Sequence, residues 1–314
     1  MKVEIAGRAL TTLAGVESFP TARSVDASSN CLVELKLLSA LPELHTLNVS
    51  RNELTTVLDF SVAHTGEHEG AAEEAEAKGG EAAALSFGSR LEVADLSFNR
   101  ISVMRDLSHH KFLTRLNLAS NALTSVRGLR GLQYLRFLDL SKNAISTLVD
   151  EGGSDGVGAM DSLGLVELRL EQNAIESLAA LGSLPRLQTL TVAQNQIASM
   201  RGLDGCPSLV ELDIRSNRVS EVVELARLVS GLRALQTVGN PMNDEDSYRE
   251  RAVLLVPSLR HLDETEVFPI EKMSTINKHG GDVEHRQEVL RELLPGEPFV
   301  DYCPPLDAPK LPEE

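Results

Sequence analysis

The sequence predicts a right-handed α/β solenoid in which each repeat adds one short strand to a single parallel sheet. Three observations favour this fold. Apolar residues recur in a fixed order around an asparagine. In the two clearest copies the asparagines, Asn121 and Asn143, stand 143 − 121 = 22 residues apart. Each copy also joins an alternating segment to a turn-forming segment. Since one such unit cannot bury its own apolar residues, the units must stack.

The two clearest copies span residues 113–126 and 135–148, and both read L-x-x-L-x-L-x-x-N-x-L. This is the leucine-rich repeat pattern. The alternation around Leu116 and Leu118 predicts a strand with one buried face, on the concave side of the solenoid. The asparagine side chain both donates and accepts hydrogen bonds, so we expect it to satisfy the backbone of neighbouring turns and form a ladder. Apolar residues then recur every third position, which suits a 3₁₀ or irregular helical turn on the convex side.

About ten units align on this pattern. In the first unit, Met1–Leu13, Arg8 takes the place of the asparagine, and we interpret this unit as an N-terminal cap whose turn has no preceding neighbour to bond. The remaining units are centred on Asn30, Asn52, Asn99, Asn121, Asn143, Asn173, Asn195, Asn217 and Asn240.

Two insertions interrupt the period. The step from Asn52 to Asn99 is 47 residues, so 47 − 22 = 25 are extra. They fall within residues 61–88, whose acidic, low-complexity composition predicts disorder, with a transient helix as the alternative. A further 30 − 22 = 8 residues precede Asn173. Both insertions follow a strand and its turn, so they should emerge on the convex side. Because Asn52 adjoins the long insertion, its replacement should cost less stability than that of Asn143.

A C-terminal cap is predicted over residues 239–263, which closes a solenoid spanning residues 1–263. A helix from about Asp246 to Val256 should cover the last repeat with Val253 and Leu254. Pro257 should end this helix, and Leu259 and Leu262 should fix the segment that follows.

The tail, residues 264–314, departs from the repeat. A short helix is predicted near 282–294, with Asp282 as its N-cap and Pro295-Gly296 after its end. The proline-rich stretch Phe299–Pro312 suits an extended segment that docks on this chain or on a partner, or else a disordered tail.

The cap resembles that of intracellular leucine-rich repeat proteins with repeats of this length. They include the nuclear regulatory subunit of protein phosphatase 1, a spliceosomal protein and an axonemal dynein light chain. The resemblance covers Met1 to about Asp263 and implies a solenoid that binds protein partners, which differ among these relatives. The phosphatase subunit binds through aromatic and acidic residues on its concave face. Lys2-Val3-Glu4-Ile5 is the nearest stretch to a phosphatase docking motif, Arg/Lys-Val-x-Phe.

Composition narrows the function. The 314 residues carry a formal net charge of −16, which argues against nucleic acid as a partner. No apolar run reaches about eighteen residues, so no membrane partner is expected. The N-terminus lacks an apolar signal region. Cys31, Cys206 and Cys303 are widely spaced and odd in number, which favours a reducing compartment. We therefore expect a cytoplasmic protein, with nucleus or cilium as alternatives, that is monomeric alone.

The sequence offers no catalytic residues, no metal site, no cofactor and no small-molecule substrate. His64 and His68 fall in the long insertion without a third metal ligand nearby. His109 and His110 are expected to be exposed on an outer turn. Cys206 lies on an apolar position and should be core.

The concave face is the predicted partner-binding site. Its candidates are the outward residues of the strands: Phe137, Asp139, Arg115, Asn117, Asp95, Arg169, Glu167, Asp213 and Arg215. Phe137 stands out because a large aromatic ring pointing to solvent among charged neighbours suits an interface anchor. Coverage of this ring by the chain's own tail is the alternative. The sequence thus predicts a non-catalytic protein-interaction scaffold. Its alternatives are a regulatory subunit of a protein phosphatase 1-type enzyme and an axonemal or cytoskeletal component.

Overall fold

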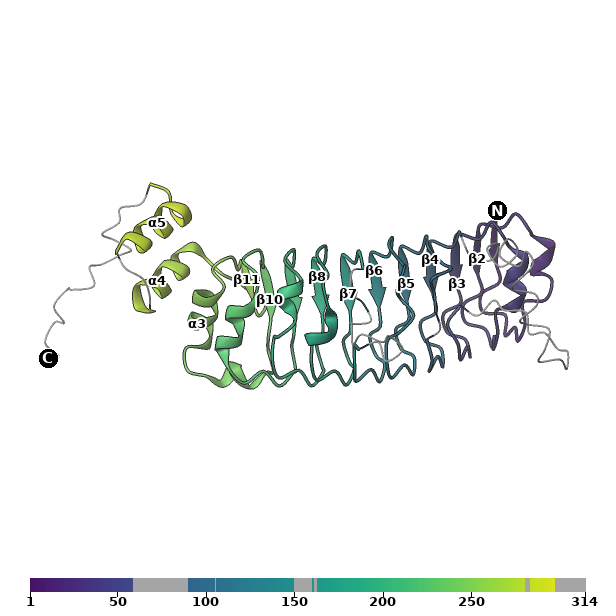
Figure 1. Ribbon diagram of the computed structural model, residues 1–314, viewed down its shortest axis with the longest axis horizontal. Coiled ribbons are helices and arrows are strands. Elements are labelled where there is room, and N and C mark those ends of the chain that lie inside the picture. The colour runs from purple at the N-terminus through teal and green to yellow at the C-terminus, as the bar shows by residue number, and fades with distance from the viewer. Residues whose placement is uncertain (59–89, 105, 150–159, 161–162, 280–282, 297–314) are drawn as a thin grey trace, which may run out of the picture.

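The computed structural model describes residues 1–314 except 59–89, 105, 150–159, 161–162, 280–282 and 297–314. The molecule is an elongated stack of turns that runs from β2 near the N-terminus to α5 near the C-terminus (Figure 1). Strands succeed one another along one side of the stack. The predicted solenoid with a parallel sheet is confirmed.

Within the described residues the sheet has twelve strands, arranged in chain order. Neighbours from β1 to β11 are parallel, and β12 folds back antiparallel on β11. In each of the first ten strands the middle residue is buried and the flanking residues face outward. The strands are β1 (Lys2–Glu4), β2 (Ser24–Asp26), β3 (Thr46–Asn48), β4 (Val93–Asp95), β5 (Arg115–Asn117), β6 (Phe137–Asp139), β7 (Glu167–Arg169), β8 (Thr189–Thr191), β9 (Glu211–Asp213), β10 (Ala234–Gln236), β11 (His261–Leu262) and β12 (Thr265–Glu266).

Neither insertion disturbs the sheet. Leu47 of β3 pairs with Ala94 of β4, and Leu138 of β6 pairs with Leu168 of β7, in the same register as the regular repeats. The long insertion, residues 61–88, lies outside the described residues, as does most of the shorter one. The strand face is therefore continuous from β1 to β11, as the position of the insertions in the repeat predicts.

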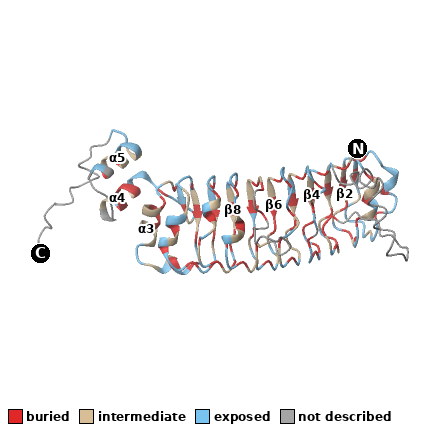
Figure 2. Cartoon of the chain, in the orientation of Figure 1, coloured by how far each residue is buried: buried red, intermediate tan, exposed pale blue. Residues whose placement is uncertain are grey.

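Helical turns, six of them 3₁₀ helices, lie between the described strands. They are η1 (Val16–Ser18), η2 (Lys36–Ala40), η3 (Ala179–Leu181), η4 (Leu203–Gly205), η5 (Val222–Arg227) and η6 (Pro241–Asp244). Leucine, isoleucine and valine side chains from strands and turns form one continuous core. Buried residues, drawn in red in Figure 2, recur along the stack. The core includes Cys206, which is buried as predicted.

His110 departs from expectation. His109 is exposed, but His110 is only 5% exposed. Its backbone N–H donates to the Leu107 carbonyl at 2.8 Å and its carbonyl accepts from the Leu113 N–H at 3.0 Å. The chain turns tightly at His110 to enter the next repeat, and this turn brings the imidazole to the inside.

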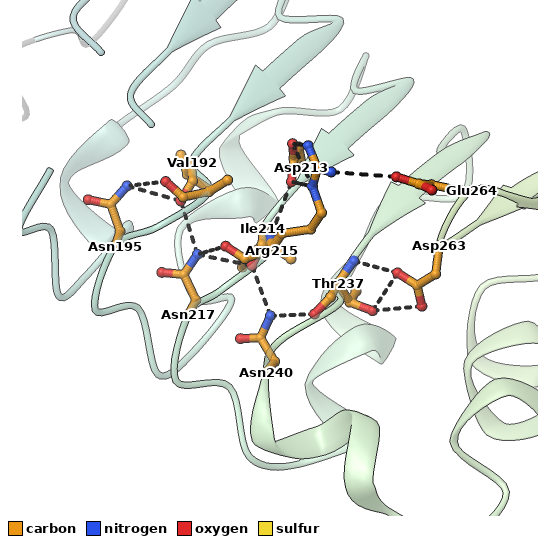
Figure 3. Close-up of polar contacts among 11 residues, drawn as sticks. Val192, Asn195, Asp213, Ile214, Arg215, Asn217, Thr237, Asn240, Asp263 and Glu264 are labelled. Carbon is orange, nitrogen blue, oxygen red and sulfur yellow. Dashed lines mark hydrogen bonds and ion pairs between the residues drawn. The ribbon is translucent and has the colours of Figure 1, made fainter. Parts of the chain in front are cut away.

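The asparagine ladder is present and reaches backward along the chain (Figure 3). Asn217 donates through Nδ2 to the Ile214 carbonyl of its own turn and to the Val192 carbonyl of the preceding repeat, both at 3.0 Å. Its Oδ1 accepts from the Ile197 N–H at 3.0 Å. Each asparagine thus serves the turn before it.

The cap is more extensive than predicted. Helix α3 (Tyr248–Leu255) covers the last repeat and packs on η5, but it buries Ala252 and Val253 while Leu254 is only half-buried. Leu259 and Leu262 are buried as expected. Two helices follow, α4 (Pro269–His279) on α3 and α5 (Val283–Leu293) on α4. Helix α5 occupies the segment where the sequence predicts a helix, whereas α4 is unexpected.

Candidate protein-interaction face

The side of the sheet that points away from the core is called the open face. It is formed by two rows of residues from β1 to β10, called the first and the third row after their positions in these three-residue strands. The first row is the opening residue of each strand: Lys2, Ser24, Thr46, Val93, Arg115, Phe137, Glu167, Thr189, Glu211 and Ala234. The third row is the closing residue: Glu4, Asp26, Asn48, Asp95, Asn117, Asp139, Arg169, Thr191, Asp213 and Gln236. The strand ladder fixes the order of these side chains.

Phe137 lies between two guanidinium groups. Arg115, its partner in β5, places Cζ 4.3 Å from the ring centroid, and Arg169 in β7 places Cζ 5.4 Å from it. Both distances are in the range of cation–π contacts. The sequence predicts a ring that points to solvent. The ring does lie on the open face, but it is half-buried because the neighbouring strands lay their arginines against it.

Most of the acidic and amide candidates of the third row accept hydrogen bonds from the turn that directly follows their strand. Asp139 accepts from the Ser141 N–H at 2.9 Å and from Ser141 Oγ at 2.6 Å, and it is only 8% exposed. Asp95 accepts in the same way from Ser97, and Asn117 from the Ala119 N–H. These side-chain bonds to the backbone two residues later are Asx turns. They shape the edge of the sheet and leave only part of each side chain for a partner.

The remaining charged candidates form ion pairs on the open face. Arg169 contacts Glu167 Oε1 through Nη2 at 2.6 Å. Arg215 donates hydrogen bonds to the Asp213 carboxylate through Nε and Nη2, and its Nη1 lies 3.7 Å from Glu264 Oε1 (Figure 3). The hydrogen bond to Asp213 raises the pKa of Arg215. The structure therefore places the candidates in two groups, one around Phe137 and one around Asp213.

Sequence reasoning missed an aromatic pair just before strands β5 and β6. Phe112 and Tyr134 are 53% and 51% exposed, and their rings stack with centroids 6.0 Å apart and planes 16° apart. They occupy the same position in successive repeats, since 134 − 112 = 22. Tyr134 precedes Phe137 by three residues, so their Cα atoms are within roughly 11 Å. The sequence does indicate this pair, because an aromatic residue stands just before the leucine that opens each of these two repeats.

A hollow of about 320 Å³ lies in the open face between β8 and β11. Its side-chain lining includes Thr189, Thr191, Glu211, Asp213, Gln236 and Glu264. Two oxygens in this lining, Thr191 Oγ1 and Gln236 Oε1, are buried and have no hydrogen-bond partner among the described residues. This hollow includes Asp213 but none of the other predicted candidates.

Other kinds of site find little support in the described part of the chain. It contains no group of three or more His, Cys, Asp or Glu side chains placed to hold a metal ion. None of its helices is both long and apolar enough to cross a membrane. Burial raises the pKa of the Cys206 thiol to about 11, which suppresses its thiolate. His64 and His68 lie outside the described residues, and the absence of catalysis remains a prediction.

Comparisons with known proteins point to one fold. A sequence family described as leucine-rich repeat matches residues 156–281, a range that includes α4. Leucine-rich repeat-containing protein 23 of Bos taurus is 28% identical over 266 residues, covering 84% of this chain and 68% of the relative. The Homo sapiens protein of the same name is 29% identical over 268 residues, with the same coverage.

Among solved structures, an internalin of Listeria monocytogenes superposes with a TM-score of 0.61 at 19% identity, covering 88% of this chain and 71% of that one. At this identity the likeness concerns the fold. The resemblance to a phosphatase subunit or a dynein light chain remains a prediction. The 22-residue pattern, the asparagine ladder and these matches agree that the chain has the leucine-rich repeat fold.

Proposed function

We propose that this chain is a non-catalytic scaffold that binds a partner protein on its open face, centred on β5 and β6. The observation that carries the proposal is the group of aromatic and arginine side chains in and just before strands β5 to β7. Phe112 and Tyr134 stack while more than half exposed, and Phe137 lies between Arg115 and Arg169 close by. Aromatic residues and arginine dominate the energetics of protein interfaces.

The fold suits this role because the open face is rigid. Every strand from β1 to β11 is held in register by its neighbours, and the Asx turns fix the ends of the strands. A surface that is already ordered loses little conformational entropy when a partner binds. The continuous register across both insertions also keeps this surface uninterrupted.

Affinity purification of the tagged full chain, with mass spectrometry of the proteins recovered, tests the proposal. The wild type is compared with Phe137→Ala and Tyr134→Ala. Val223→Ala is the control, because Val223 is also a large exposed apolar residue but lies in η5, away from the sheet. We expect a partner that both aromatic variants lose, by roughly tenfold or more, and that the control retains. Equal recovery by all four proteins would place the interface elsewhere.

The recovered protein also decides between narrower roles. Recovery of a phosphatase catalytic subunit would support the role of a regulatory subunit of a protein phosphatase 1-type enzyme. The C-terminal cap of this chain resembles that of such a regulatory subunit. Dynein or tubulin would support an axonemal or cytoskeletal component. We propose that the protein is cytoplasmic. Recovery of a phosphatase catalytic subunit would instead favour the nucleus, and recovery of dynein or tubulin would favour the cilium.

A further inference from the structure

The hollow between β8 and β11 owes its shape to small side chains. Thr189, Thr191 and Ala234 line it where the preceding strands carry Phe137 and Arg169. On the side nearest the C-terminal cap, the hollow is lined by His261 and Glu264. Its volume of about 320 Å³ lies at the lower end of the range for ligand pockets. The hollow therefore has room for one long side chain of a partner and for little more.

Its charge is negative. The lining contains the carboxylates of Glu211, Asp213 and Glu264 but neither lysine nor arginine. Arg215 offsets part of this charge, through its bonds to Asp213 and its approach to Glu264. Glu211 is exposed and takes part in no ion pair within the described residues. The group that complements this hollow carries positive charge.

Within the described part of the chain, two side-chain oxygens of residues that line the hollow lack a hydrogen-bond donor. Thr191 Oγ1 and Gln236 Oε1 are both buried in its lining without a protein partner among the described residues. Glu171, which follows β7, has an oxygen, Oε2, in the same condition. Buried polar atoms are almost always hydrogen-bonded, so each exception calls for an explanation. An ammonium group brings three donors and a guanidinium five, and neither brings an acceptor.

We propose that this hollow receives a lysine or arginine side chain of the partner protein. The inference rests on the proposed function, because it specifies what that partner presents to the open face. The long methylene stem would lie over Thr189 and Ala234, and the charged head would reach Glu211 and the buried oxygens.

The proposal sets a spacing for the partner. The hollow is centred near β9, three strands from Phe137 in β6. At about 4.8 Å per strand this is roughly 14 Å. A partner in extended conformation spans that distance in about four residues, and a helix spans it in about ten. The basic residue should therefore stand at one of these spacings from the group that contacts Phe137.

The test uses the full chain and three capped pentapeptides, Gly-Gly-X-Gly-Gly, with lysine, arginine or norleucine at X. Binding is followed by NMR titration at low salt. We expect weak, saturable binding of the two basic peptides and none of the norleucine peptide, which has a similar length without the charge. Glu211→Gln and Thr191→Val should each weaken binding at least fivefold. Glu176→Gln, an exposed site outside the sheet, removes the same charge and should leave binding unchanged.

Thermal unfolding separates binding from folding. Thr191→Val removes a hydroxyl that has no partner to lose, so its melting temperature should equal or exceed that of the wild type. Equal weakening by Glu176→Gln would show diffuse attraction to an acidic protein and overturn the proposal, as would binding of the norleucine peptide. If the partner is lost by Phe137→Ala but retained in full by Glu211→Gln and Thr191→Val, this inference fails while the proposed function stands.

Discussion

Asn99 donates from Nδ2 to the carbonyl oxygen of Val49 at 3.0 Å, across 50 residues of chain. Its Oδ1 accepts from the Leu54 N–H at 3.0 Å. The long insertion falls between these partners, yet the bonds are those that Asn217 makes to the repeat directly before it. The ladder therefore joins repeats that are neighbours in space, and its hydrogen bonds do not depend on the length of chain between them.

The ladder predicts equal losses at Asn52 and Asn143. Asn52 donates to Ala27, Val49 and Ser50 and accepts from Leu32, and Asn143 has the equivalent four partners. The sequence favours a smaller loss at Asn52, but the bonds give no reason for one. Either residue changed to alanine should lower the free energy of unfolding by about 1–3 kcal/mol in urea denaturation.

Asn117→Ala is the matched control for the ladder. Asn117 belongs to the third row and accepts one bond, from the Ala119 N–H at 3.0 Å. Its loss should be about 0.5–1 kcal/mol, near the lower end for a single hydrogen bond. A loss as large as that at Asn143 would mean that the number of turn contacts does not determine stability.

Deleting Glu67–Ala84 should leave the melting temperature nearly unchanged. Strands β3 and β4 already pair in regular register, so the deletion removes no strand contact. Shortening a long loop changes its closure entropy by only a fraction of 1 kcal/mol. Differential scanning calorimetry measures this directly. A drop of more than about 5 °C would show that the segment stabilises the solenoid.

Phe137→Ala should cost the free protein about 1–2 kcal/mol. The ring loses its contacts with Arg115 and Arg169, each worth about 0.5–1 kcal/mol at a partly exposed site. This loss of unfolding free energy is larger than the negligible loss that the sequence-based expectation of a solvent-exposed ring predicts. Urea denaturation of wild type and variant gives the difference.

The same measurement tests whether the end of the tail, residues 297–314, covers Phe137. Removing residues 297–314 from the wild type and from Phe137→Ala completes a double-mutant cycle. Additive effects show that the tail and Phe137 are independent. A coupling above about 0.5 kcal/mol would favour coverage by the tail over partner binding.

The cap depends on Asp263. Its Oδ1 accepts from the Thr237 N–H at 2.6 Å, and its Oδ2 accepts from the Tyr248 hydroxyl at 3.0 Å. Thr237 is fully buried, so Asp263→Ala leaves it without this partner and should cost about 1–3 kcal/mol. Tyr248→Phe removes one donor and should cost less. Hydrogen exchange should show the loss in β10, β11 and α3; a uniform loss along the solenoid would contradict a local role.

Glu224 gives a pH-dependent contribution. Its carboxylate accepts from Ser199 Oγ at 2.7 Å and from the Met200 N–H at 2.9 Å. The Ser199 hydrogen bond is the largest of the causes that lower the pKa of this carboxyl from its ordinary value of 4.5. Because the folded pKa is lowered, the stabilisation is present above 4.5 and is lost as the pH falls through the folded pKa.

Glu224→Gln should therefore be less stable than the wild type near neutral pH, and the difference should shrink below about pH 4. Urea midpoints at several pH values, with exposed Glu176→Gln as the control, measure it. A difference that stays constant with pH would mean that the Glu224 charge is not involved.

Local pattern was sufficient for the repeat itself. The period placed the strands, the ladder and the buried leucines, because each repeat contacts only its neighbours and so meets the same environment. The pattern also put Phe137 on the open face. It could not show that Arg115 and Arg169 lie against the ring, since they come from other repeats and their rotamers depend on the register of three strands.

Departures from expectation occur where a residue's surroundings come from outside its own repeat. Helix α4 contains no leucine and departs from the 22-residue pattern, and its position is set by contact with α3. His110 is buried because the chain turns there into the next repeat. The hollow between β8 and β11 exists only because small side chains from separate strands fall side by side below the cap. The sequence alone determined the solenoid, since its period is local and repeated. The shape and charge of the open face were decided by the tertiary structure, which brings together residues that no short pattern connects.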